Sequence, residues 1–184
     1  MNKLSILVGA FLCLMINVGY SQACSSGSNG YQMIDFNDLA RGEVITTQYS
    51  GVTFSSSGGR KLVAFDTGTP TQAPIPGDNS NGDADMGSPN SLCPGGGPGI
   101  GAAGGPSGSG PNCTFLGNVL IIEEHFVDQD GDGHDDYPDD LGGGGEIIME
   151  FDEPTTIGII GFLDDIEVTV YICLLYTSPS PRDS

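Results

Sequence analysis

The sequence predicts an all-β domain, a jelly-roll-like β-sandwich that carries one long Gly-rich surface loop. Three observations predict this class. Several short apolar runs alternate with a period of two, as strands with one buried face do. Residues typical of turns separate these runs at short intervals. No stretch combines the 3.6-residue period of an amphipathic helix with capping residues.

The strands follow from these runs in chain order. Residues 146–151, EIIMEF, alternate so that three apolar side chains share one face and two glutamates share the other. The richer apolar runs 118–124 and 156–163 are typical of central strands buried on both faces. Shorter strands are expected at residues 31–36, 51–55, 61–65 and 167–171.

The N-terminal residues are typical of a secretory signal peptide. Lys3 gives a positive start, Leu4–Val18 is apolar, and small residues allow cleavage after Ser21 or Ala23. The apolar run is short for a membrane span, so we expect residues 1–21 to be removed and no transmembrane segment in the mature chain. The protein is therefore expected to be secreted, with attachment to the cell surface as a further possibility.

The last twelve residues, CLLYTSPSPRDS at 173–184, resemble the translation of a transposase-end sequencing adapter. We therefore expect them to be an artefactual tail, and we expect the native part of this sequence to end near Ile172. The β-sandwich domain is then assigned to residues 22–172 and is expected to be truncated at its C-terminal end. Its length is that of one domain.

The chain is strongly acidic, with 24 acidic and 5 basic residues and a formal net charge of −19 at pH 7. Such a surface repels nucleic acid and anionic membranes, and it attracts divalent cations. We therefore expect no nucleic-acid partner.

Residues 68–111 are rich in Gly, Pro, Ser and Asn, and we expect them to form a long, partly disordered surface loop, in which the Gly-rich stretch 94–111 buries almost nothing. No Lys-Ser/Thr pair follows the glycines, which argues against a phosphate-binding loop. Cys93 and Cys113 bracket the glycine run and are expected to form a disulfide in the oxidising environment of a secreted protein. Cys24 is then lipidated, free or paired elsewhere.

The stretch DQDGDGHDDYPDD at residues 128–140 contains seven aspartates with two glycines between them. Its spacing matches that of calcium-binding loops, in which alternate positions supply oxygen ligands and a glycine makes the sharp turn. Pro138 and the glycines at 142–145 argue against a helix on the C-terminal side, so we expect this loop to join strands. The expected calcium ligands are Asp128, Asp130, Asp132, the carbonyl of His134, Asp136 and Asp139.

Other acidic groups are weaker candidates. Asp66, Asp83 and Asp85 are spaced loosely for a second calcium site, and turn formation explains aspartates there equally well. His125 lies near two glutamates, but two histidines offer zinc too few ligands. The pair Asp164-Asp165 fits a glycosidase only in principle. We therefore expect no enzymatic activity in this chain.

Several segments together resemble a group of uncharacterised secreted bacterial proteins. They include LGNVLIIEEHFVDQDGDGHDDYPDD and GGGGEIIMEFDEP, which are similar to that group's apolar strand, acidic loop and following strand pair. GDADMG departs from the more usual GDPDLG of the group. The resemblance implies an all-β sandwich at the cell surface without an established catalytic activity.

The sequence thus predicts a secreted, calcium-binding β-sandwich module of a cell-surface or extracellular matrix protein. Its expected role is binding or scaffolding, and carbohydrate is the expected ligand class by analogy with other sandwiches. The alternative is the N-terminal portion of an extracellular hydrolase whose catalytic part is missing.

Overall fold

The computed structural model describes residues 32–70, 83–100, 111–153 and 155–162, together with the backbone of three outlying strands. The described residues form strands, with no α-helix and only two 3₁₀ turns, η1 (Ser57–Gly59) and η2 (Ala84–Met86). The predicted all-β class is confirmed at this level. The strands are β1 (Asn2–Val8), β2 (Cys13–Met15), β3 (Met33–Ile34), β4 (Val52–Ser56), β5 (Leu62–Asp66), β6 (Asn118–Ile122), β7 (Gly145–Phe151), β8 (Ile159–Gly161) and β9 (Thr169–Cys173).

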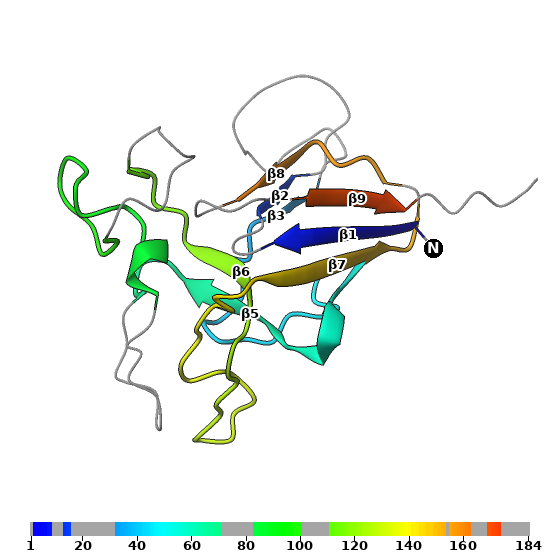
Figure 1. The fold of residues 1–184 in the computed structure, drawn as a ribbon, viewed down its shortest axis with the longest axis horizontal. Helices are drawn as coiled ribbons and strands as arrows, with labels where there is room; N and C mark the ends of the chain where they lie inside the picture. The colour runs from blue at the N-terminus through cyan, green and yellow to red at the C-terminus, as the bar shows by residue number, and fades with distance from the viewer. Residues whose placement is uncertain are drawn as a thin grey trace, which may run out of the picture.

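The strands form three small antiparallel sheets (Figure 1). The first has the order β4-β7-β1-β9, the second β3-β2-β8, and the third is the two-stranded ribbon β5-β6. In the first sheet, Val52 to Ser56 of β4 pair in register with Phe151 to Ile147 of β7.

The β5-β6 ribbon is buried on both faces. Leu62 and Ala64 lie in the main core cluster with Phe54 of β4 and Met149 of β7. On the opposite face, Val63 and its neighbours form a second cluster: Val63, Phe65, Met86, Val119 and Ile121. The ribbon therefore separates two apolar layers, as expected for the richer apolar run at 118–124.

Three aromatic rings anchor the main cluster. Phe36 is fully buried and meets both Tyr49 and Phe54 edge to face, at centroid distances of 5.6 and 5.9 Å. Tyr49 donates its hydroxyl to the Asp38 carboxylate at 2.5 Å. Burial, helped by this carboxylate, raises the pKa of Tyr49 well above its usual value.

The residues predicted to be a signal peptide take part in two sheets. β1 lies between β7 and β9, and β2 lies between β3 and β8. The prediction treated this segment as separate from the fold, whereas the structure pairs its backbone with the core strands. The expected cleavage sites lie outside the described residues, and cleavage itself stays a prediction.

Two predicted strands are shorter than expected. The run at 156–163 forms only the three-residue β8, in which Ile159 is 53% exposed, so its apolar richness does not make a central buried strand. The run at 31–36 forms only the two-residue β3. At residue 36 the backbone adopts a left-handed φ of 59° and leaves the strand geometry while the phenyl ring enters the core.

The described part of the Gly-rich loop contains several buried residues, which its composition does not predict. Met86, Ser88 and Asn90 are at most 1% exposed. The Ser88 hydroxyl contacts the Thr67 hydroxyl at 2.7 Å and accepts a hydrogen bond from the Leu116 amide at 2.9 Å. Residues 86–90 are therefore mostly buried, which the composition of the loop does not predict, whereas residues 94–98 and Ile100 are exposed, as expected for the Gly-rich stretch.

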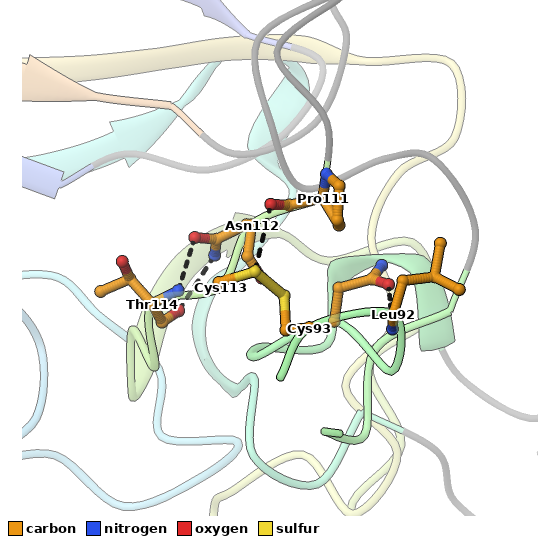
Figure 2. The surroundings of a disulfide bond; sticks show 7 residues. Leu92, Cys93, Pro111, Asn112, Cys113 and Thr114 are labelled. Atoms are coloured by element: carbon orange, nitrogen blue, oxygen red, sulfur yellow. Dashed lines mark hydrogen bonds between the residues drawn. A yellow bond between two sulfur atoms is a disulfide. The ribbon is translucent and has the colours of Figure 1, made fainter. Parts of the chain in front are cut away.

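The predicted disulfide between Cys93 and Cys113 is confirmed (Figure 2). Its two Cα atoms lie 5.4 Å apart. Beside it, the amide of Asn90 donates to the carbonyl of Asn112 at 2.8 Å. Both contacts join the loop at 83–100 to the chain that enters β6. Cys24 lies outside the described residues.

Candidate metal site

The acidic loop connects the end of β6 to the start of β7, and its two ends are hydrogen-bonded to each other. An isolated antiparallel bridge pairs Glu123 with Asp140, and the Leu141 amide donates to the Ile122 carbonyl at 2.9 Å. Deeper in the loop, the Asp136 amide donates to the Val127 carbonyl at 2.8 Å. The loop is therefore carried between strands, as predicted, and its two arms are tied to each other at several levels.

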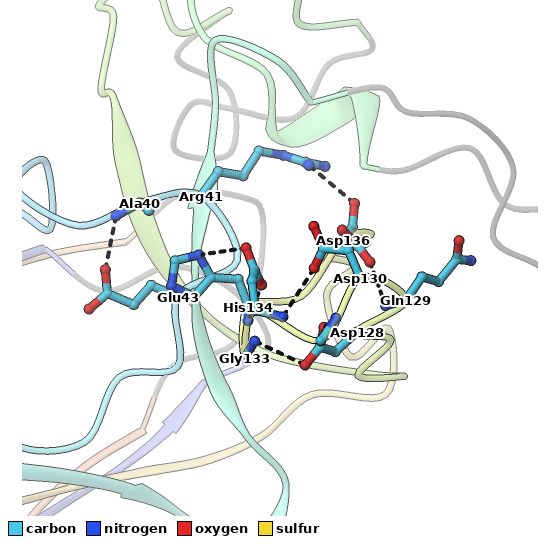
Figure 3. A network of polar contacts seen from close by, with 11 residues as sticks. Ala40, Arg41, Glu43, Asp128, Gln129, Asp130, Gly133, His134 and Asp136 are labelled. Atoms are coloured by element: carbon cyan, nitrogen blue, oxygen red, sulfur yellow. Dashed lines mark hydrogen bonds and ion pairs between the residues drawn. The ribbon is translucent and has the colours of Figure 1, made fainter.

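Three of the predicted ligands converge at the tip of this loop. One carboxylate oxygen from each of Asp128, Asp130 and Asp136 lies within 4.8 Å of the others (Figure 3). A hard divalent cation prefers such oxygen ligands, and calcium accepts six to eight of them in flexible geometry. The cluster supplies three, and backbone carbonyls and water are the usual source of the rest.

The backbone of the loop holds Asp128 in place. Its two carboxylate oxygens accept hydrogen bonds from the amides of Gly131 and Gly133, at 2.7 and 3.0 Å. Both glycines have a positive φ, 81° and 89°, which other residues rarely adopt. The sixth loop residue therefore bends the chain back onto the first, which is the role of glycine at that position in calcium loops.

The remaining predicted ligands lie differently. Asp132 accepts a hydrogen bond from the His134 amide at 2.8 Å, and its carboxylate is not part of the three-aspartate cluster. Asp139 is only 6% exposed, and its amide donates to the Glu123 carboxylate at 3.2 Å. Asp139 is also outside the cluster. Ligation by these residues and by the His134 carbonyl stays a prediction.

The basic side chains of residues 32–70, 83–100 and 111–153 all contact this loop or its base. Arg41 donates to the carbonyl of Asp136 at 3.3 Å (Figure 3). Arg60 donates to the carbonyls of Glu123 and Glu124, at 3.3 and 2.6 Å. Lys61 lies 3.0 Å from the centre of the Phe126 ring. In these contacts the cations bind main-chain carbonyls and an aromatic ring. Loop amides also donate to clustered carboxylates, since the Gln129 amide donates to Asp136 and the Gly131 and Gly133 amides donate to Asp128.

Sequence reasoning missed a buried acidic layer beneath the loop. Glu123 and Asp135 are each 2% exposed. The Asp135 Oδ1 atom accepts hydrogen bonds from the amides of Val127 and Tyr137, at 3.2 and 3.0 Å, whereas its buried Oδ2 atom has no hydrogen-bond partner. Burial, and then the facing Asp135 carboxylate, raise the pKa of Glu123 to about 9.

A second acidic contact lies beside this layer. Asp83 accepts a hydrogen bond from the Asp140 amide at 2.7 Å. Burial, and then the nearby Asp140 carboxylate, raise the pKa of Asp83 to about 9. Asp83 thus ties the Gly-rich loop to the acidic loop, across 57 residues of sequence. Only the alternating aspartates of the loop carry a local sequence signal; these long-range pairings carry none.

Gly42 marks the place where the acidic loop meets the rest of the domain. Its carbonyl accepts a hydrogen bond from the Asp135 amide at 2.8 Å, and a Cβ atom added to Gly42 would lie 2.0 Å from the Asp135 carbonyl oxygen. Gly42 also has a left-handed φ of 77°. The residue is therefore needed both for its backbone conformation and for the close approach of the loop.

Gly42→Ala is expected to be strongly destabilising. The left-handed backbone costs about 1–2 kcal/mol for a residue with a Cβ, and the overlap with Asp135 adds about 1–3 kcal/mol. Urea unfolding followed by circular dichroism measures the sum. Gly51→Ala is the matched control, because Gly51 has a φ of 84° and open space around its Cβ position. Equal losses in the two variants would mean that the loop does not dock at Gly42.

The weaker candidates do not assemble into a second site within the described residues. The Asp66 carboxylate binds the Gly68 amide and the Thr69 hydroxyl of its own turn, at 2.8 and 2.7 Å. This is the turn chemistry that the sequence allowed as the alternative. The pair Asp164-Asp165 lies outside the described residues.

A shallow hollow of about 220 Å³ lies at the other end of β7, where Gln32, Ser50, Asp152 and Glu153 are among its lining residues. Its polar groups form no recognisable catalytic arrangement.

No helix in the described residues is long and apolar enough to cross a membrane. No protein-family model, curated protein or solved structure matches this chain.

Proposed function

We propose that the acidic loop binds a calcium ion that stabilises this domain, and that the domain is a secreted β-sandwich module with a binding or scaffolding role. The observation that carries the calcium site is the convergence of Asp128, Asp130 and Asp136 at the loop tip. Like charges held this close repel one another, and a divalent cation between them relieves the repulsion.

Two further features support a structural ion. The positive φ of Gly131 and Gly133 and their amide bonds to Asp128 hold the loop in a curled form. Arg41 and Arg60 donate hydrogen bonds to main-chain carbonyls of the loop and its base, which helps to fix the loop. An ion at the tip then joins the two arms of the loop and stabilises the return to β7.

The wider role rests on more general features. The formal net charge of −19 suits a soluble extracellular module and disfavours nucleic acid as a partner. The Cys93–Cys113 disulfide suits an oxidising compartment. Carbohydrate or another cell-surface component is proposed as the ligand by analogy of fold class alone.

Calcium is expected to raise the melting temperature of the full chain. Binding only to the folded state stabilises it by about 2.7 kcal/mol when free calcium is one hundred times Kd. Calorimetric titration of calcium-free protein should show one site, and magnesium should substitute poorly because it requires tighter octahedral geometry. Absence of both binding heat and a thermal shift would refute the site.

Asp130→Asn tests the loop directly. The amide keeps an oxygen that can accept the hydrogen bond from Asp132, so the calcium-free fold is expected to be retained while one ligand charge is lost. The calcium-induced thermal shift should largely disappear. Asp85→Asn removes the same charge from an exposed position outside the cluster and should leave the shift intact. An equal reduction in both variants would indicate non-specific attraction to an acidic surface.

A further inference from the structure

The buried acidic layer lies at the base of the acidic loop, apart from the three aspartates of the tip. Residues from both ends of the loop build it, because Glu123 follows β6 whereas Asp135 and Asp139 precede β7. The three residues are 2%, 2% and 6% exposed. None of them belongs to the cluster at the tip. The loop therefore carries two groups of carboxylates, one at its tip and one at its buried base.

The carboxylates of the base are held in place by backbone amides. The two oxygens of Glu123 accept hydrogen bonds from the amides of His125 and Asp139, at 3.0 and 3.2 Å. The Asp135 Oδ1 atom accepts two further amide bonds from the loop, whereas its buried Oδ2 atom has no hydrogen-bond partner. The Asp135 carboxylate faces that of Glu123. A buried carboxylate oxygen is thus aimed at a second buried carboxylate, with no protein donor between them.

The charge of this layer is not balanced by the basic side chain beside it. Buried charges in proteins are paired or bind metals, because an unpaired charge is costly away from water. Arg41 acts electrostatically on both Glu123 and Asp135, so it offers one positive charge to two carboxylates. Asp140 pairs with Glu123 through a backbone bridge and adds a further carboxylate close by, which faces Asp83. The base therefore suits an additional cation.

We propose that the base of the loop is a second cation site, in which Asp135 Oδ2 and the Glu123 carboxylate bind one calcium ion and Asp139 is a ligand there and not at the tip. Oxygen ligands of this kind suit a hard divalent cation, and carbonyls and water complete its shell. Asp139 stands at the last ligand position of the calcium-loop spacing, but it is buried beside Glu123. This site does not depend on an ion at the tip.

The docking of the loop closes the base. The Asp135 amide donates to the Gly42 carbonyl at 2.8 Å, and the carboxylates of Asp135 and Glu123 are nearly inaccessible. An ion therefore enters when the loop docks during folding, and it leaves only through local opening. A calcium titration of the folded protein consequently reports the tip alone, and the ion at the base is detected by its retention.

The test measures the calcium that the full chain retains. The protein is unfolded in urea with a chelator to remove metal, and it is refolded with calcium while the disulfide stays intact. A brief chelator treatment of the folded protein then strips the tip, and a sizing column removes free metal. Atomic emission spectrometry gives the calcium content per chain. We expect one retained ion per chain, and none when calcium is added only after folding.

Asp135→Asn tests the base directly. The amide keeps an oxygen for the amides of Val127 and Tyr137, so the fold is expected to be retained while one ligand charge is lost. The variant should retain at least about ten-fold less calcium, because the charge of the ligands sets the affinity. Asp130→Asn is the matched control, since it removes the same charge at the tip and should retain the full ion.

Complete loss of calcium from the unaltered protein would overturn the proposal whether or not the variants fold, because the facing carboxyl groups would then share only a proton. Equal retention in Asp135→Asn and the unaltered protein would overturn it too, as would loss of the ion in Asp130→Asn, which would assign the ion to the tip. Failure of the tip site has a different signature, since it removes the calcium-induced thermal shift of the folded protein. The two sites can therefore fail separately.

Discussion

Glu123→Gln is expected to flatten the dependence of stability on pH, so that the calcium-free variant gains stability relative to the wild-type protein between pH 4 and pH 8. Burial and the Asp135 carboxylate raise the pKa of Glu123 from 4.5 to about 9, so the folded state retains a proton that the unfolded state releases. Rising pH between about 4.5 and 9 therefore lowers the free energy of unfolding, by at most about 1.4 kcal/mol per pH unit for one proton. Below this window both states are protonated, and the contribution is fully present.

Glutamine, like the protonated glutamate, carries no charge and supplies a donor, but it keeps only one of the two oxygens that accept hydrogen bonds from the His125 and Asp139 amides. The loss of one such bond lowers the stability at every pH and leaves the slope unaffected. That donor is placed near Asp135, whose buried Oδ2 atom has no hydrogen-bond partner in the wild-type structure. The variant should consequently show a flatter dependence of stability on pH. Urea unfolding in the presence of a chelator, at pH values from 4 to 9, measures the slope.

Glu124→Gln is the matched control for charge. Glu124 is the next residue and is only half-buried. It contacts the loop through its amide, which donates to the Asp139 carbonyl, and not through its carboxylate. The control should keep the wild-type slope. If both variants flattened the slope equally, the acidic character of the whole surface would be responsible and not the buried pair.

Removing the disulfide with Cys93→Ala/Cys113→Ala is expected to lower the free energy of unfolding by about 3 kcal/mol, since the bond closes a loop of this length in the unfolded chain. The separation of the two cysteines is 20 residues. The composition of the Gly-rich loop alone predicts a modest loss. The structure raises this expectation, because Met86, Ser88 and Asn90 of the Gly-rich loop are buried.

The measurement is urea unfolding of the double variant beside the wild-type protein, with peptide mapping to verify the bond. Hydrogen exchange should show which contacts loosen, and the Ser88 and Asn90 amides are expected to exchange faster. Cys24→Ala is the control, because it removes a cysteine without opening this loop. A double variant as stable as the wild type would mean that the hydrogen bonds around Ser88 hold the loop unaided.

The sequence by itself determined the class of secondary structure, the disulfide and the cluster of aspartates at the loop tip. Each of these has a local cause. Alternation in 146–151 needs only the two-residue period of a strand. Asp128, Asp130 and Asp136 lie within nine residues, and the intervening glycines bend the chain so that these carboxylates meet. Patterns of this length can be read directly because the chain between the residues is too short to place them elsewhere.

Only the tertiary structure decided the contacts between distant segments. Arg41 reaches the loop across 95 residues, Asp83 meets Asp140 across 57, and Glu123 faces Asp135 because the loop folds back on its base. Strand pairing is likewise non-local: Asn2 lies opposite Phe151, which apolar composition near the N-terminus does not predict. An apolar run serves equally well as a leader or as a strand, and the choice depends on which strand edge is available to it. That edge is created by packing of β7 into the core, which no local pattern encodes.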